Sequence, residues 1–267
     1  MESNSNLHSA RLTTGVTLPY LALGDPAGTP LVLLHAWGES RGSFDRLTAL
    51  LPKGIRVFAP DQRGHGTADK PATGYALAHF AADVAAFLDA LELPDADLLG
   101  SSSGGYVAQQ VAIDHPERVS GLVLVGSPRT LRGRPPFADE VEKLTDPIDP
   151  SWVRATLRWF RLVAEVPEWY IENRVLDGVR MPAHVWSDAL RGLYEAEPPT
   201  ETGIITTPTL ILWGAADELL SGADERTLAD AIPNSRLIVY ENTGHLVLWE
   251  RPERMAADVA HFIGRTR

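Results

Sequence analysis

Cysteine is absent from the 267 residues. The chain therefore has no disulfide, no thiol nucleophile and no Cys ligand for zinc. No apolar run approaches the roughly 18 residues that a transmembrane helix needs. The first ten residues contain no basic stretch leading into an apolar segment, as a secretory signal would. We therefore expect a cytoplasmic protein with no membrane partner.

Basic side chains are fewer than acidic ones, with 24 Lys and Arg against 35 Asp and Glu. The net charge of −11 repels phosphate backbones, so a nucleic-acid partner is not expected. Apolar residues make up 44% and charged residues 22%, which is ordinary for a globular protein and excludes extended disorder. The expected partner is a small-molecule substrate, and a monomer and a homodimer are both compatible with the composition.

Short apolar runs alternate with helical patterns along most of the chain. Continuous apolar strands of this kind fit a parallel sheet covered on both faces, so the pattern predicts an α/β protein with a doubly wound, mostly parallel sheet. Thr17–Leu23 is expected to be an additional antiparallel strand, at an edge because it contains Pro19. The other expected strands are Leu31–Leu34, Ile55–Phe58, Ala96–Leu99, Gly121–Val125, Thr209–Trp213 and Arg236–Tyr240. The expected helices are Ala76–Leu93, Tyr106–His115, Ala223–Ala231 and Pro252–Ile263.

One segment interrupts the alternation. From Arg129 to Thr202 there is no convincing strand, and four of the seven Trp residues lie in amphipathic stretches between Pro-rich ends. We interpret residues 129–202 as a helical insertion between two parts of one core, 1–128 and 203–267. The tryptophans of the insertion either line a pocket or form the insertion's own core; they are Trp152, Trp159, Trp169 and Trp186.

Residues 100–104 read Gly-Ser-Ser-Ser-Gly and match the pattern G-x-S-x-G. An apolar run precedes the motif and a helix-compatible run follows it, as a nucleophile on a strand-to-helix turn requires. Gly100 and Gly104 remove the side chains that would collide in such a strained turn. We therefore predict Ser102 as the nucleophile, rather than a Ser-rich loop without chemistry.

A serine hydroxyl needs a base to take its proton. Of the eight histidines, His245 alone lies in a loop between the last apolar strand and the last helix. That loop and Ser102 share the carboxyl edge of the sheet. An orienting carboxylate is expected at the same edge, and Asp217 follows the preceding strand. His8 is interpreted as part of a polar tail.

The loop after the first long apolar strand reads His35-Ala-Trp37-Gly. Two backbone N–H groups must stabilise the oxyanion of an acyl-transfer reaction, and we expect these to belong to Trp37 and Ser103. His35 is expected to brace the loop. The segment from Asp61 to Gly66 is interpreted as structural, with Asp61 and Arg63 pairing with each other or with the backbone. No H-x-x-x-H or HExxH spacing occurs, so no metal site is expected. The serine mechanism implies no organic cofactor either.

Taken together, these segments resemble the α/β-hydrolase superfamily. The resemblance implies an eight-stranded sheet with a helical lid inserted after strand six, and a triad in the order Ser102, Asp217, His245. Two positions depart from the usual pattern, Ala36 in place of Gly and Ser101 in place of His or Asn. The segments that carry the resemblance are residues 35–38, 61–66, 100–105, 115–119, 213–217 and 244–245.

The resemblance also separates the branches of the superfamily. Haloalkane dehalogenases and epoxide hydrolases use Asp at the position of Ser102, which argues against both of these activities. Carbon–carbon bond hydrolases usually carry Trp where this chain has Leu246, which disfavours that activity. Trp37 is shared with cofactor-free perhydrolases, which implies perhydrolysis as a side activity. The Ser-Ser-Gly pattern is shared with resorcylic-macrolide lactonases, but the loop Gly126–Pro128 lacks the carboxylate that some of them use.

The sequence thus predicts a serine hydrolase that cleaves an ester or lactone of a medium-sized apolar or aromatic molecule through an acyl-enzyme. Two alternatives stay open. One is a hydrolase-fold receptor that holds a ligand or cleaves it slowly. The other is a carbon–carbon bond hydrolase or a lyase that uses the same triad. A hydroxynitrile-type lyase needs an additional cationic group in the pocket, and the candidates in the insertion are Arg154, Arg158, Arg161, Arg174, Arg180 and Arg191.

Overall fold

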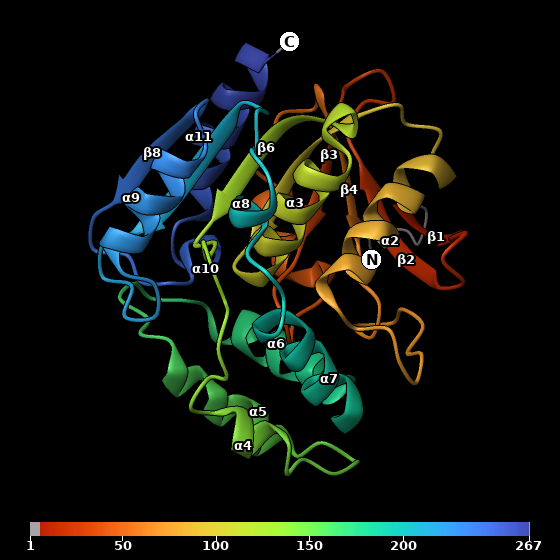
Figure 1. Ribbon diagram of the computed structural model, residues 1–267, viewed down its shortest axis with the longest axis vertical. Helices are drawn as coiled ribbons and strands as arrows, with labels where there is room; N and C mark the ends of the chain where they lie inside the picture. The colour runs from red at the N-terminus through yellow and green to blue at the C-terminus, as the bar shows by residue number, and fades with distance from the viewer. Residues whose placement is uncertain (1–5, 267) are drawn as a thin grey trace.

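The computed structural model describes residues 6–266. Within this range eight strands form one sheet in the order β1-β2-β4-β3-β5-β6-β7-β8 (Figure 1). Strands β3 to β8 are parallel to one another, whereas β2 pairs antiparallel with both β1 and β4. The strands are β1 (Leu7–Arg11), β2 (Thr17–Leu23), β3 (Thr29–Leu34), β4 (Ile55–Pro60), β5 (Ala96–Ser101), β6 (Val119–Val125), β7 (Thr209–Gly214) and β8 (Ser235–Tyr240).

Helices cover both faces of the sheet. Because successive side chains of a strand point to opposite faces, β3 contributes Val32 and Leu34 to one buried cluster and Leu31 and Leu33 to another. The first cluster includes residues of α2 (Leu77–Ala90), α3 (Ser103–Asp114) and α9 (Gly222–Ala231). The second includes residues of α1 (Asp45–Thr48), α10 (Val247–Glu250) and α11 (Pro252–Thr266). The predicted doubly wound architecture is confirmed.

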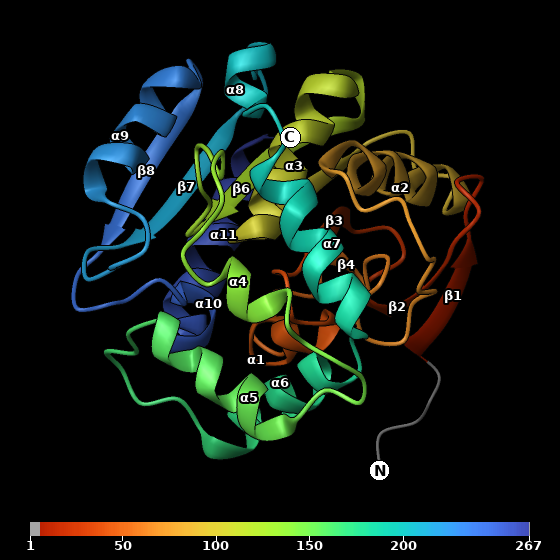
Figure 2. The same ribbon diagram turned by 60° about the horizontal axis from the view of Figure 1, so that its bottom comes forward.

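The chain between β6 and β7 forms helices and contains no strand. Four of its α-helices, α4 to α7, gather at one end of the sheet, whereas α8 lies beside α3 (Figures 1 and 2). These elements are α4 (Ala138–Val141), α5 (Pro150–Ala155), the 3-10 helix η4 (Thr156–Trp159), α6 (Glu168–Val179), α7 (Ala183–Tyr194) and α8 (Pro199–Thr202). Two further 3-10 helices of the described chain lie outside the helical segment, η2 (Arg41–Phe44) and η3 (Pro116–Arg118).

The amino-terminal part of the sheet corrects two expectations. β2 is not an edge strand, because β1 pairs along its outer side with Leu7 opposite Leu21 and Arg11 opposite Thr17. His8 therefore belongs to β1 rather than to a polar tail, and its ring stacks on Tyr20 at 5.3 Å. The helix after Ser102 also starts earlier than expected, at Ser103 instead of Tyr106.

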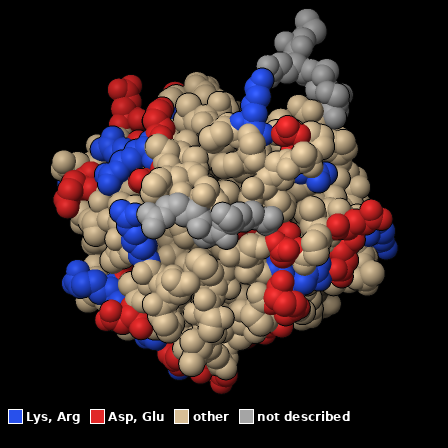
Figure 3. All heavy atoms as spheres, turned by 90° about the horizontal axis from the view of Figure 1, so that it is seen from above, with Lys and Arg blue, Asp and Glu red and all other residues tan. Residues whose placement is uncertain are grey.

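Charged side chains of both signs lie next to one another on the face shown in Figure 3. Among the described residues, no helix is long and apolar enough to span a bilayer.

Candidate active site

Ser102 occupies a strained turn between β5 and α3. Its backbone has φ 50° and ψ −121°, a combination outside the regions that non-glycine residues commonly adopt. The two flanking glycines make this turn sterically feasible, because a Cβ on Gly100 would collide with the backbone of Gly104, and one on Gly104 with the backbone of Leu34. The turn places the Ser102 hydroxyl at the carboxyl end of β5, as the motif predicts.

Three predicted side chains meet at this edge. Ser102 Oγ lies 3.0 Å from Nε2 of His245, and Nδ1 of His245 lies 2.8 Å from Oδ2 of Asp217. The His245 and Asp217 side chains are almost fully buried, at 2% and 0% exposure. A hydroxyl, an imidazole and a carboxylate in this order can deprotonate the hydroxyl and stabilise the imidazolium that results.

The loop that carries His245 is held in place by Glu250, a residue outside the set expected from the sequence. One Glu250 oxygen accepts the N–H of Gly244 at 2.9 Å. The other accepts the N–H groups of Val163 and Ala164, at 3.0 and 2.7 Å. Glu250 thus fixes the His245 loop and ties it to the helical segment. No sequence pattern marks this role, since the carboxylate lies in a short helix five positions after His245.

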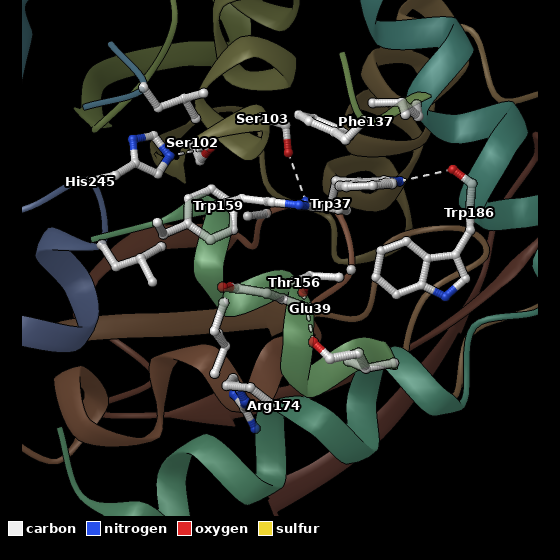
Figure 4. A pocket seen from close by; sticks show the side chains of 18 of the residues that line it. Trp37, Glu39, Ser102, Ser103, Phe137, Thr156, Trp159, Arg174, Trp186 and His245 are labelled. Carbon is white, nitrogen blue, oxygen red and sulfur yellow. Dashed lines mark hydrogen bonds between the residues drawn. The ribbon is translucent and has the colours of Figure 1, made fainter. Parts of the chain in front are cut away.

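The two expected oxyanion donors lie side by side. Ser103 is the first residue of α3, where backbone N–H groups have no intrahelical partner. The Trp37 N–H lies close to it and donates to Ser103 Oγ at 2.7 Å. The Trp37 indole N–H donates to the carbonyl of Trp186 in α7 at 3.2 Å, so the oxyanion loop is joined to the helical segment (Figure 4).

A cavity of about 140 Å³ opens in front of Ser102 and His245 (Figure 4). Loops at the carboxyl edge of the sheet form one wall, and the helical segment forms the other. Most of the lining is apolar, with the Trp37 ring parallel to that of Trp159 at 6.4 Å and perpendicular to that of Trp186 at 4.7 Å.

Three of the four tryptophans in the helical segment either line the cavity or pack inside the segment. Trp159 and Trp186 line the cavity. Trp152 packs edge-on against both of them, at 6.1 and 5.1 Å, and so supports the wall from behind. Trp169 is 54% exposed and belongs to neither group.

Two buried charged residues contribute to the cavity wall, Glu39 and Arg174. Trp249 donates its indole N–H to Glu39 at 3.2 Å, and Arg174 pairs with Asp177 at 3.0 Å. Burial raises the pKa of Glu39 above its ordinary value. Arg174 is the member of the arginine group in the helical segment that reaches this cavity. The other five arginines named above form ion pairs with acidic neighbours. They are Arg154, Arg158, Arg161, Arg180 and Arg191.

In the segment from Asp61 to Gly66, Asp61 and Arg63 do not pair with each other, but both hydrogen-bond to the backbone, which is the second of the two expected arrangements. Asp61 pairs with Arg41 and accepts the Thr67 N–H at 2.8 Å, whereas Arg63 forms two bonds to Asp83, at 2.5 and 2.6 Å. Asp61 and Arg63 are therefore bound to separate partners. The sequence did not indicate Asp83, because it lies 20 residues from Arg63 on the face of α2 that packs against the core.

His35 braces the loop that carries Trp37. Its Nε2 accepts the backbone N–H of Gln62 at 3.0 Å, and its backbone carbonyl accepts the Gln62 side-chain amide at 2.7 Å. Burial lowers the pKa of His35 to about 4 and that of His65 to about 3, so both are neutral at pH 7. Over the described part of the chain, no group of three or more His, Asp or Glu side chains is arranged to hold a metal ion.

A family model for the alpha/beta hydrolase fold matches residues 29–182. The chain belongs to the α/β-hydrolase family. A 2-hydroxymuconate semialdehyde hydrolase from Pseudomonas sp. (strain CF600) is 32% identical, over 89% of this α/β-hydrolase and 87% of its own length. A non-heme chloroperoxidase from Streptomyces lividans is 30% identical, over 93% and 96%. An esterase from Exiguobacterium antarcticum superposes with a TM-score of 0.84 at 26% identity, covering 96% of this α/β-hydrolase and 98% of the esterase.

Proposed function

We propose that this α/β-hydrolase cleaves a carboxylic ester or lactone through an acyl-enzyme. The observation that carries the proposal is the continuous path from Ser102 Oγ through His245 to Asp217, at the wall of an apolar cavity. Similarity to an esterase of known structure supports the same reaction class.

In the first half of the reaction, Ser102 Oγ attacks the substrate carbonyl while His245 Nε2 takes the hydroxyl proton. Asp217 holds the imidazole so that Nε2 faces Ser102, and its charge stabilises the imidazolium. The N–H groups of Trp37 and Ser103 stabilise the oxyanion, where each donor contributes about 3–4 kcal/mol in a well-studied hydrolase. His245 then returns the proton to the leaving alcohol oxygen, and the acyl group stays on Ser102.

In the second half, His245 deprotonates a water molecule that attacks the acyl-enzyme. The carboxylic acid leaves when the proton returns to Ser102 Oγ, which restores the starting state. Each proton moves between His245 Nε2 and an oxygen atom, so these residues complete the cycle without a redox step.

The cavity indicates the size and character of the substrate. Its volume of about 140 Å³ is close to that of a protein cavity of about 150 Å³ that holds benzene. The flanking rings of Trp37, Trp159 and Trp186 favour an apolar or aromatic group beside the scissile bond. Because the helical segment supplies one wall, we propose that residues 129–202 act as the lid that selects the substrate.

Hydrolysis of a carbon–carbon bond on the same triad is the second candidate. It is favoured by the 32% identity to a 2-hydroxymuconate semialdehyde hydrolase. The two reactions differ in their substrates, since the second needs a dicarbonyl compound whose carbon leaving group is protonated. If the protein is more active towards a muconate semialdehyde than towards any ester, carbon–carbon bond hydrolysis replaces ester hydrolysis as the proposed function.

The test combines a fluorophosphonate probe with p-nitrophenyl esters of increasing acyl size, aromatic lactones and a muconate semialdehyde. We expect covalent labelling of the wild-type protein and turnover of the aromatic or medium-sized esters. Ser102→Ala should lose both, whereas Ser120→Ala, near the amino end of β6 and outside the cavity lining, should retain both. Labelling of Ser102→Ala at the wild-type rate would refute the assignment of the nucleophile.

A further inference from the structure

The Trp37 N–H, one of the two proposed oxyanion donors, already has an acceptor in the protein itself. Ser103 Oγ lies 2.7 Å from the Trp37 nitrogen, at the short end of the range for N–H···O bonds (Figure 4). A backbone N–H carries a single proton to donate. The Ser103 hydroxyl and a substrate carbonyl therefore cannot both form a full hydrogen bond to Trp37.

We propose that the Ser103 hydroxyl caps the oxyanion hole of the free enzyme and is displaced when the substrate carbonyl binds. This inference rests on the proposed function, because it concerns the donor that the ester reaction uses. Ser103 thus has two opposing effects: its backbone N–H stabilises the oxyanion, and its side chain competes with the substrate for the second donor.

A second, smaller cavity offers the displaced hydroxyl a place to go. It has a volume of about 20 Å³, close to the space that one water molecule needs, and Trp37, Ser103, Gln62 and His65 contribute to its lining. A side chain as short as serine changes the position of its hydroxyl by a single rotation about χ1, from one staggered rotamer to another.

The polar atoms around this smaller cavity are suited to a hydroxyl donor. Gln62 Oε1 and His65 Nε2 are buried, and neither has a hydrogen-bond partner among the described residues. His65 Nδ1 faces the carbonyl of Arg63 at 2.8 Å, so it carries the proton and leaves Nε2 as an acceptor in the neutral ring. Both atoms therefore accept hydrogen bonds, and the Ser103 hydroxyl is a donor that lines the same space.

The capped arrangement should slow the enzyme by a measurable factor. The net contribution of one intramolecular hydrogen bond changes an equilibrium constant by about 2- to 10-fold, here the constant between the capped and the open oxyanion hole. Removing the hydroxyl should therefore raise kcat/KM by about 2- to 10-fold, mainly through a lower KM, because the displacement accompanies substrate binding. A side chain that only supported the fold would give unchanged or lower activity when shortened.

The experiment measures the second-order rate of fluorophosphonate labelling, together with kcat and KM for a p-nitrophenyl ester. Ser103→Ala is compared with the wild type and with Ser101→Ala, which removes the hydroxyl on the other side of Ser102. We expect faster labelling and a lower KM in Ser103→Ala alone. Ser103→Cys, whose sulfur is a weak acceptor, should lie between Ser103→Ala and the wild type.

Two results would overturn the proposal. Equal rates in Ser103→Ala and the wild type would show that the hydroxyl does not compete for the Trp37 N–H. A lower rate in folded Ser103→Ala, as judged by its melting temperature, would show that the hydroxyl assists the reaction. Failure of the wild type itself to react with the probe would instead count against the proposed hydrolase function.

Discussion

The Asp217 carboxylate uses its two oxygens for different tasks. Oδ2 lies 2.8 Å from His245 Nδ1, while Oδ1 accepts the backbone N–H groups of Leu219 and Leu220 at 2.8 and 3.0 Å. The two backbone donors fix the plane of the carboxylate. As a result, the oxygen that faces His245 is held in place before any substrate binds.

This arrangement predicts a large effect of Asp217→Asn. The amide oxygen should keep the two backbone N–H groups, which turns the NH₂ group towards His245. Nδ1 must then accept, the ring proton moves to Nε2, and His245 no longer takes the Ser102 proton. We expect kcat to fall by about 10⁴-fold with the fold intact. Steady-state kinetics test this, with Glu218→Gln as the control. An effect of less than 10-fold would contradict the proposed role of Asp217.

The buried pair between Arg63 and Asp83 should matter for stability. Both side chains are nearly inaccessible, at 6% and 4% exposure. Asp83→Ala leaves the guanidinium without its counter-charge, so we expect a loss of about 3–5 kcal/mol in the free energy of unfolding. Asp89→Ala removes a 61% exposed carboxylate paired with Arg118 and should cost less than about 1 kcal/mol. Urea denaturation measures the free energy of unfolding of both variants. Equal losses in Asp83→Ala and Asp89→Ala would contradict the prediction.

The sequence was most informative where strands are buried. Apolar runs such as Leu31–Leu34 and Thr209–Trp213 are covered on both faces, so their composition alone indicates a parallel sheet. The triad residues could be predicted for a related reason, because all three follow strands of that sheet. β1 was missed because four of its five residues are exposed, which leaves almost no apolar pattern.

Other features depend on contacts that no local pattern encodes. Arg63 and Asp83 meet only after α2 packs onto the sheet, and Glu250 reaches Gly244 only through the fold of the last loop. α3 begins at Ser103 although its first residues, Ser and Gly, are weak helix formers, because tertiary packing overrides that preference. The bond from Trp37 to Ser103 depends on the position of one hydroxyl, which no sequence pattern specifies.

The close approach of Trp186 to the oxyanion loop should make Gly38 sensitive to substitution. Gly38 has φ +81°, and a Cβ there would lie 2.7 Å from Cη2 of the Trp186 indole. Gly38→Ala should therefore displace Trp186 or the loop and lower kcat/KM by about 10-fold or more, since small misplacements near the reacting groups are costly. Gly15→Ala, at φ +92° with no atom within 4 Å of its Cβ, shares the backbone strain without the clash. It should lose stability but keep its kcat/KM, and equal activity losses in the two variants would count against this reasoning.

Glu225 should make the protein less stable as the pH rises through neutrality. Burial raises the pKa of Glu225 to about 8, and the negative charges of Asp217 and Asp224 add to the effect. Below about pH 4.5 the carboxyl is protonated in both the folded and the unfolded chain and makes no difference. Between pH 4.5 and 8 the unfolded chain releases the proton while the folded protein retains it, so the free energy of unfolding decreases.

Glu225→Gln removes this penalty, because the amide is neutral in both states. The variant should match the wild type near pH 4.5, gain stability relative to it up to about pH 8, and keep a constant advantage of a few kcal/mol above that pH. Melting temperatures at several pH values measure this difference in stability between the variant and the wild type. Asp230→Asn removes an exposed carboxylate of the same helix and should not reproduce it. A difference in stability between Glu225→Gln and the wild type that stays the same at every pH would show that folding does not raise the pKa of Glu225. The stability change would then come from packing rather than from proton release.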